Sequence, residues 1–284
     1  MSGRPYAEVI GDPIAHSKSP LIHNFWLGKL GIDAEYRACH VLVDELADYF
    51  ARRRGDAAWR GCNVTIPHKV TVVDLLDKCD QRVREIGAAN CVVPAQSGLL
   101  GSNTDIDGIA EAVRHDDGFG ICLIGNGGAA RAALWHFAQR SKGWFQHHHK
   151  RSVAIVARDT AKSEALLREF DLPGSAYRFA DFARSLAGVS LIVNASSLGM
   201  RDQPPLPAKL ISNLSSAYGD TLVFDMVYNP LETALLREAR RHGFATSDGL
   251  KMLIGQAATA FEHFFGAKVP REHDAELRAL LTAP

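Results

Sequence analysis

The chain has 284 residues, of which 46% are hydrophobic and 23% charged, and its 32 basic residues balance its 32 acidic ones. This length allows one or two domains with cores of their own, and the charge balance argues against nucleic acid or an anionic membrane as partner. No stretch approaches the roughly 18 apolar residues of a membrane helix, and no basic start precedes a long apolar run. The five cysteines are scattered without a Cys-x-x-Cys pair, so they predict neither disulfides nor zinc and suit a reducing cytoplasm.

In the first third of the chain, short apolar segments alternate with segments of helical spacing. The predicted elements are strands at 6–10, 34–43 and 61–66, helices at 21–30, 44–54 and 70–76, a hairpin turning at 97–98, and a helix at 106–113. Ser19 fits the N-cap of the first helix and Pro20 its first turn. The hydroxyls of Ser17 and Ser19 can equally offer hydrogen bonds to a polyol ligand. Asp105, taken alone, is most simply the N-cap of the helix that follows it.

Lys69 follows the third predicted strand. Val64 and Ile66 favour extended backbone, whereas Pro67 lacks the N–H that a continuing central strand needs. Lys69 is therefore expected just beyond a strand end, where α/β folds usually place their chemistry. A single lysine in such a place is most often a solvated surface residue, so its role depends on the residues that join it.

A second unit is predicted from Gly120 onwards. A strand at 121–124 leads through Gly125-Asn-Gly-Gly-Ala-Ala130 into a helix at 131–139, which is the context of a dinucleotide-binding turn. Its glycines permit a tight turn and close approach to a pyrophosphate, whose charge meets the helix N-terminus. The next strand, at 153–157, is followed by Arg158 and Asp159, and an acidic residue there is placed to hold a ribose hydroxyl.

The alternation continues and predicts a parallel, doubly wound sheet. The remaining elements are strands at 190–195 and 221–227 and helices at 163–170, 249–265 and 272–281, with loops at 196–200 and 226–230 on the side of a bound nucleotide. Gln256 lies off the apolar face of its helix and is by default solvated. The segment 141–151 holds three adjacent histidines without helical spacing or acidic companions, so we expect an exposed loop and no metal site.

In their order along the chain, these segments resemble the shikimate dehydrogenase family. The matching segments are Gly11-Asp-Pro-Ile-Ala-His-Ser-Lys-Ser-Pro20, Asn63-Val-Thr-Ile-Pro-His-Lys69, Gly87-Ala-Ala-Asn90, Asn103-Thr-Asp105, Gly125-Asn-Gly-Gly-Ala129, Val193-Asn-Ala-Ser196, Asp225-Met-Val-Tyr-Asn-Pro230 and Asp248-Gly-Leu-Lys-Met-Leu-Ile-Gly-Gln256. The resemblance implies an N-terminal α/β substrate domain, a Rossmann-type doubly wound dinucleotide-binding domain, and C-terminal helices that pack back on the first domain. We expect the substrate-binding and catalytic domain at 1–105 and 247–284, and the NAD(P)-binding domain at 106–246.

The resemblance also implies an activity, namely reversible NAD(P)-dependent hydride transfer between shikimate and 3-dehydroshikimate. Lys69 and Asp105 would be the catalytic pair, because an amine oriented by a carboxylate can handle the proton that accompanies the hydride. The substrate, a small cyclic polyol acid, would be bound by Ser17, Ser19 and Tyr228 at its carboxylate and by Thr65, Asn90, Gln256 and Asn63 at its hydroxyls. The implied cofactor-binding residues are Gly125, Asn126, Gly127, Gly128, Ala129, Arg158, Asp159, Lys162, Ser196, Met226 and Gly249. A monomer or a homodimer is expected.

Several positions depart from the pattern of the family. His68 replaces a residue that is often aromatic, Cys91 a common threonine and Ile106 a common glycine. These changes leave open quinate or an aminoshikimate-like ring as substrate, or a nucleotide-binding regulatory relative without turnover. Asp159 replaces the threonine that would contact a 2′-phosphate. Arg158 and Lys162 would attract that phosphate, but the carboxylate would repel it, so we expect NAD to be favoured over NADP.

Overall fold

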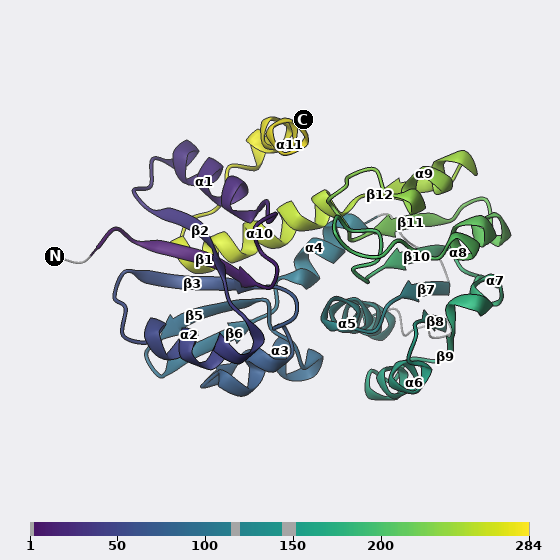
Figure 1. The fold of residues 1–284 in the computed structure, drawn as a ribbon, viewed down its shortest axis with the longest axis horizontal. Helices are drawn as coiled ribbons and strands as arrows, with labels where there is room; N and C mark the ends of the chain where they lie inside the picture. Colours follow the sequence, from purple (N-terminus) through teal and green to yellow (C-terminus); the bar gives the residue numbers. More distant parts are fainter. Residues whose placement is uncertain (1–2, 115–119, 144–151, 284) are drawn as a thin grey trace. The chain divides into compact units, whose positions relative to one another are not determined.

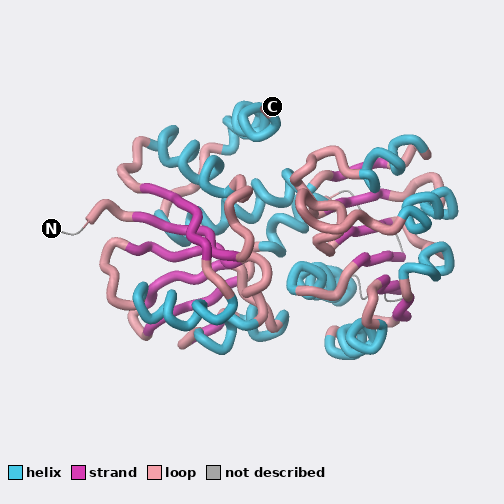
Figure 2. Tube along the Cα trace, in the orientation of Figure 1, coloured by secondary structure: helices cyan, strands magenta, loops and turns pink. Residues whose placement is uncertain are grey.

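A computed structural model describes residues 3–114, 120–143 and 152–283 of the chain. The chain divides into two compact units, the first formed by Met1–Asp107 and Leu253–Pro284, the second by Gly108–Met252. Each unit contains one six-stranded sheet with helices packed on it (Figure 1, Figure 2). None of the helices in the described ranges combines the length and apolar character needed to cross a membrane.

The sheet of the first unit is mixed. In spatial order its strands are β2 (Glu35–His40), β1 (Tyr6–Gly11), β3 (Trp59–Val64), β5 (Cys91–Ala95), β6 (Gly98–Ser102) and β4 (Lys78–Cys79). β1 runs parallel to β2 and β3, whereas β5 runs antiparallel to β3 and β6. The carboxyl ends of β1, β3 and β6 and the amino end of β5 therefore share one edge of the sheet.

Helices cover both faces of this sheet. The helices of this unit are α1 (Ser19–Leu30), α2 (Leu46–Arg53), α3 (Gln81–Ile86), most of α10 (Gly249–Phe265), and α11 (Asp274–Thr282), which packs on α1; α4 (Asp105–Ala112) begins in this unit. Figure 1 shows α1 and α10 on one face and α2 on the other. In β3, Cys62 and Val64 pack into the core that contains α2, whereas a Cβ at Gly61 would meet Phe264 of α10. Because side chains alternate along a strand, Asn63 faces α10 as well.

An aromatic cluster joins α1, β2 and α10. The ring of His23 stacks on Tyr36, with centroids 3.9 Å apart and planes at 4°, and lies beside Trp26, Phe261 and Phe264. His23 is fully buried, and neither ring nitrogen has a hydrogen-bond partner among the described residues. Burial lowers the pKa of His23 to about 3, so the ring is neutral in the folded protein.

This histidine is expected to make the fold sensitive to acid. The unfolded chain binds a proton at His23 below pH 6.5, but the folded chain cannot do so until about pH 3. Stability from this site is therefore complete above pH 6.5 and is lost as the pH falls towards 3. Between pH 7.5 and pH 4.5, the parent should lose about 3 kcal/mol more of its free energy of unfolding than His23→Leu, which has no group to protonate at this site. Urea unfolding of both proteins at the two pH values would measure this difference. A difference that is independent of pH would contradict the neutral, desolvated ring.

The second unit has a fully parallel sheet. In spatial order its strands are β12 (Ala245–Ser247), β11 (Leu222–Asp225), β10 (Leu191–Asn194), β7 (Gly120–Ile124), β8 (Ser152–Val156) and β9 (Gly174–Tyr177). The helices of this unit are α5 (Gly128–Gly143), α6 (Thr160–Glu169), α7 (Phe182–Ser185), α8 (Ala208–Ser212) and α9 (Ala234–Arg241). Counted from β7, the spatial order is 3-2-1-4-5-6, which is the Rossmann arrangement. The predicted fold class is confirmed.

Some predicted elements are wrong in type or extent. The helix expected at 70–76 is a 3₁₀ helix, η2 (Thr71–Leu75), in a run of β-branched residues that lowers α-helix propensity. The 44–54 helix starts as the 3₁₀ turn η1 (Val43–Glu45) before α2. β4, β9, β12, α3, α7, α8 and α9 were not predicted. α5 continues to Gly143, where an exposed loop was expected, and the three histidines lie outside the described residues.

Two capping assignments are also wrong. The N-cap of α1 is Lys18, and Ser19 is the first helical residue; its N–H donates to Ser17 Oγ at 3.3 Å. Asp105 is the first residue of α4, and its carboxylate binds side chains from other elements.

Candidate active site

Lys69 and Asp105 form an ion pair at the shared edge of the first sheet. Lys69 Nζ lies 2.6 Å from Asp105 Oδ2, and the exposed fractions of the two side chains are 15% and 5%. The Lys69 carbonyl accepts a hydrogen bond from Ala89 N–H at 2.8 Å, which holds the loop after β3 against the segment before β5. A charge-assisted hydrogen bond between side chains with so little solvent exposure is short and directional. The solvated-surface interpretation of Lys69 is therefore wrong.

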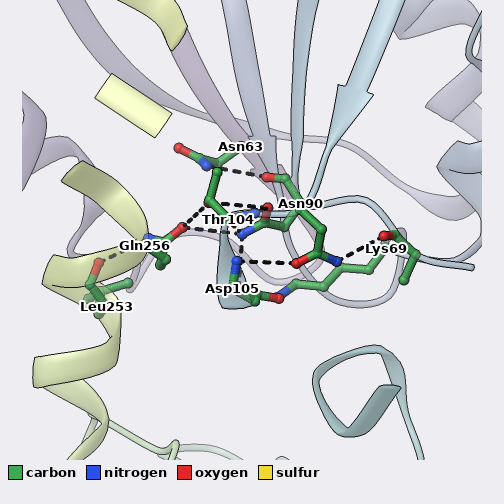
Figure 3. Close-up of polar contacts among 9 residues, drawn as sticks. Asn63, Lys69, Asn90, Thr104, Asp105, Leu253 and Gln256 are labelled. Carbon is green, nitrogen blue, oxygen red and sulfur yellow. Dashed lines mark hydrogen bonds and ion pairs between the residues drawn. The ribbon is translucent and has the colours of Figure 1, made fainter. Parts of the chain in front are cut away.

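Asn90 is the centre of the polar network around this pair (Figure 3). Its Oδ1 accepts from the Thr104 N–H at 2.6 Å, which directs its amino group towards Asp105 Oδ1 at 2.9 Å. Both oxygens of Asp105 thus accept from a donor, one from Lys69 and one from Asn90. Asn90 and Asp105 are 2% and 3% exposed, so this arrangement is held by buried contacts.

Gln256 joins the network from α10. Its Oε1 lies 3.3 Å from both Asn90 Nδ2 and Thr104 Oγ1, and its Nε2 donates to the Leu253 carbonyl at 3.0 Å. The side chain is 7% exposed, so the expectation of a solvated glutamine is wrong. The structure thus brings together Lys69, Asn90, Asp105 and Gln256 within one unit, although the first and the last lie far apart in the sequence.

Asn63 and Thr65 lie at the end of β3. Asn63 is 5% exposed and donates from Nδ2 to the Asn90 carbonyl at 3.2 Å, so it belongs to the same network. Thr65 is half-buried. A Cβ at Gly11 would lie 2.5 Å from Thr65 Cγ2, which shows that the loops after β1 and β3 touch. Only glycine fits this contact without displacing Thr65.

The other predicted substrate residues are not joined to the ion pair. Ser17 is half-buried in the segment between β1 and α1, and Ser19 is buried as the first residue of α1. Among the described residues, no hydrogen bond links either hydroxyl to Lys69 or Asp105. Tyr228 is half-buried and belongs to the second unit.

The positions that depart from the family pattern are all buried. His68 is fully buried, and its Nε2 lies 2.7 Å from the Val41 carbonyl. Cys91 is fully buried and Ile106 is 4% exposed. These residues therefore act through packing and backbone contacts rather than as exposed polar groups.

In the second unit, the predicted glycine turn lies at the carboxyl end of the first Rossmann strand. Gly125 follows β7 with φ of +108°, a conformation that favours glycine, and a Cβ there would lie 3.1 Å from the Ala195 carbonyl. Gly127 is exposed, and no atom lies within 4 Å of a Cβ built on it. α5 begins at Gly128, followed by Ala129, so free N–H groups of its first turn face this turn. The turn thus fits a pyrophosphate.

The next strand end positions three candidate residues for the cofactor. Asn126 Nδ2 donates to the Asp159 carbonyl at 2.9 Å and to Ser163 Oγ at 3.2 Å, which joins the glycine turn to α6. Asp159 is the N-cap of α6, and its carboxylate accepts from the Lys162 N–H at 2.9 Å. Arg158, Asp159 and Lys162 are exposed.

A buried polar network, which was not predicted from the sequence, holds the loops after β10 and β11. Asp225 Oδ1 accepts from Asn194 at 2.9 Å and its Oδ2 from Thr233 at 2.7 Å, while Ser196 donates to Asn194 at 2.7 Å. Burial raises the pKa of Asp225 to about 6. The one feature of the sequence that could have pointed to Asp225 is its position, as an acidic residue at the end of an apolar strand.

Met226 and Gly249 are in contact. A Cβ at Gly249 would lie 2.3 Å from the Met226 carbonyl, so only glycine allows α10 to start this close to the loop. Ser196, Met226 and Gly249 therefore lie on segments fixed at the carboxyl ends of β10, β11 and β12.

Comparison with known proteins identifies similar chains. A model of the shikimate dehydrogenase substrate binding domain matches residues 9–92, and one of the shikimate 5'-dehydrogenase C-terminal domain matches residues 249–276. Proteins named shikimate dehydrogenase (NADP(+)) from Sphingopyxis alaskensis and Methylobacterium radiotolerans are 49% and 41% identical to this chain. These alignments cover 98% and 93% of this chain and 97% and 92% of theirs.

A solved structure is similar over the same extent. It is the shikimate 5-dehydrogenase of Thermus thermophilus in complex with NADP(H) and shikimate, with a TM-score of 0.80 and 32% identity. The alignment covers 98% of this chain and 99% of that one.

The expectation that NAD is favoured over NADP is wrong. The relatives from Sphingopyxis alaskensis and Methylobacterium radiotolerans both carry NADP(+) in their names. The structure offers a physical reason, because the Asp159 carboxylate caps α6 and its charge is met by the helix N-terminus. A carboxylate occupied in this way opposes a 2′-phosphate less than a free one, and the basic residues Arg158 and Lys162 lie one and three positions from it in the sequence.

Proposed function

The chain belongs to the shikimate dehydrogenase family, and we propose that it converts shikimate reversibly to 3-dehydroshikimate with NADP, using Lys69 and Asp105 as its catalytic pair. The chain is an NAD(P)-dependent oxidoreductase of shikimate. The observation that supports the catalytic assignment is the ion pair itself, at 2.6 Å, with Asn90 on its second carboxylate oxygen.

The proposed chemistry separates a hydride from a proton. The bound dinucleotide supplies or accepts the hydride at the carbon that carries the reacting oxygen. In the reducing direction, the Lys69 ammonium donates a proton to that oxygen as negative charge develops on it. In the oxidising direction, the Lys69 amine accepts the hydroxyl proton. Asp105 keeps Nζ oriented in both directions, and Asn90 keeps Asp105 oriented.

The first unit supplies the proposed substrate residues. Ser17, Ser19, Asn63, Thr65, Asn90 and Gln256 are uncharged hydroxyl and amide side chains, which suit a ring carrying several hydroxyls. We assign Ser17 and Ser19 to the carboxylate with Tyr228, and the others to the ring hydroxyls. In this proposal, 1–105 and 247–284 form the substrate domain and 106–246 the cofactor domain.

The second unit supplies the proposed NADP residues. The turn from Gly125 to Ala129 would hold the pyrophosphate at the start of α5. Ser196, Met226 and Gly249, on the strand-end segments fixed by the Asn194–Asp225 network and the Gly249 contact, would line the nicotinamide end. Arg158 and Lys162 would bind the 2′-phosphate, whose charge a guanidinium meets with paired hydrogen bonds.

Arg158→Ala is expected to raise KM for NADP about tenfold while leaving KM for NAD nearly unchanged, because only NADP carries the 2′-phosphate. Steady-state kinetics with each cofactor would measure the two constants. Arg168→Ala removes another exposed arginine, near the far end of α6, and should change neither. Equal effects of Arg158→Ala on both cofactors would contradict this assignment.

The whole proposal is tested by following absorbance at 340 nm with shikimate, quinate and an aminated ring analogue, each with NADP and with NAD. The highest kcat/KM is expected for shikimate with NADP. A higher value for quinate or the aminated ring would identify a different substrate. Binding of NADP without turnover of any ring acid would instead favour a regulatory relative.

A further inference from the structure

Asn63 makes a hydrogen bond to a residue outside the predicted site. Its Oδ1 accepts from the Tyr36 hydroxyl at 2.7 Å, and its Nδ2 donates to the Asn90 carbonyl at 3.2 Å. Tyr36 is 1% exposed and Asn63 is 5% exposed. A side-chain amide carries two N–H donors, so one N–H of Asn63 has no partner among the described residues.

The orientation of this amide is determined from both ends. The Asn90 carbonyl can only accept, so the amino group of Asn63 must face it and Oδ1 must face the tyrosine. The Tyr36 hydroxyl is then the donor. The opposite orientation would place Asn63 Oδ1 against the Asn90 carbonyl oxygen, so the spare group presented by Asn63 is an N–H.

Tyr36 is itself held rigidly. Its ring stacks on His23, and its backbone N–H and carbonyl both bond to the Asn24 side chain of α1, at 3.0 and 2.7 Å. The Tyr36 hydroxyl that bonds to Asn63 is therefore held in place by the stacked ring of His23 and by the Asn24 side chain.

We infer that Tyr36 is a positioning residue that holds the Asn63 amide with its spare N–H directed to an oxygen of the substrate, and this inference rests on the proposed function. A hydroxyl or carbonyl oxygen accepts from this N–H, whereas an ammonium group has no lone pair to offer. The arrangement thus favours an oxygen substituent on the ring and disfavours an amino substituent at the same position.

Tyr36→Phe tests the inference in the full-length enzyme with NADP. The variant leaves Oδ1 of Asn63 buried without its donor, so KM for shikimate should rise about tenfold, with kcat changed less than about threefold. Preference for shikimate over the aminated analogue should fall. The double variant with Asn63→Ala should be no worse than Asn63→Ala alone, because both act on one contact.

Tyr49→Phe is the matched control. Tyr49 is also 1% exposed, and its hydroxyl donates to the buried Glu8 Oε2 at 2.7 Å in the same unit. Loss of a buried tyrosine hydroxyl is thus common to both variants, but only Tyr36→Phe should alter KM. Equal changes in KM in both variants, or additive effects of Tyr36→Phe and Asn63→Ala, would overturn the inference.

A measurement without substrate separates this inference from the proposed function. The side-chain amide signals of Asn63 in ¹⁵N–¹H spectra can be assigned by their loss in Asn63→Ala. They should be two sharp signals that exchange slowly with solvent in the parent, and in Tyr36→Phe they should shift and exchange faster, because slow rotation about the amide C–N bond keeps the two N–H groups distinct. Unchanged signals would overturn the inference. A parent enzyme inactive on shikimate would contradict the proposed function alone, and these signals would still decide the role of Tyr36.

Discussion

Lys69→Ala is expected to lower kcat for shikimate oxidation by about 10²–10⁴-fold, the usual scale of general acid–base catalysis. The variant loses the only group in the described network that is placed to take or give the proton beside Asp105. Asp105 would also be left buried with a charge that only Asn90 meets. The decrease should therefore be in kcat, measured at saturating shikimate and NADP, with NADP binding retained.

Lys29→Ala is the control for this variant. Lys29 lies in α1 of the same unit, and its Nζ is 2.7 Å from Glu276, so the control also removes a lysine from an ion pair. Its activity should stay near that of the parent. Full activity of Lys69→Ala would show that the proton passes through another group.

Asp105→Asn is expected to lower kcat by about 10²–10³-fold, the scale seen when a preorganised electrostatic contact is removed. The carboxylate accepts on both oxygens, from Lys69 at 2.6 Å and from Asn90 at 2.9 Å. An asparagine accepts on only one side, so its amino group must face either the lysine or the amino group of Asn90. In either orientation Nζ loses its fixed position, while the volume of the side chain is unchanged.

Asp107→Asn is the matched control, two residues further along α4. Its carboxylate accepts from Arg82 at 3.1 and 3.0 Å and is half-buried, so the same substitution breaks a comparable ion pair outside the network. Its kcat should change little. Similar losses in both variants would indicate that α4 is disturbed, rather than the catalytic pair.

The architecture of the second unit followed from the sequence because its strands are short apolar runs with clear ends. The glycine turn after 121–124 and the alternation beyond it were sufficient for a Rossmann fold, and β7, β8, β10 and β11 lie where they were predicted. β4 and β12, of two and three residues, were missed because so short a segment has no periodicity to detect.

The spacing of residues along the sequence could predict only part of the candidate site. Only the family resemblance identified Lys69 and Asp105 as a catalytic pair. From the sequence pattern alone, a lysine after a strand is most often a solvated surface residue and an aspartate before a helix is most simply an N-cap. Tyr36 carries no local signal. Thr104 and Asn194 lie within segments that match the family, but their roles, like that of Tyr36, depend on contacts between segments distant in sequence. The prediction that NAD is favoured was wrong because an aspartate in the sequence does not reveal whether its carboxylate already accepts a hydrogen bond, as that of Asp159 does from the Lys162 N–H.

The most direct test is the distance between Lys69 Nζ and the reacting oxygen in a crystal structure of the enzyme with shikimate and NADP. We expect Nζ within about 3.2 Å of the hydroxyl that is oxidised, with Asp105 still bound to the same nitrogen. A complex in which that hydroxyl faces another side chain, with Lys69 directed away from the ring, would contradict the account.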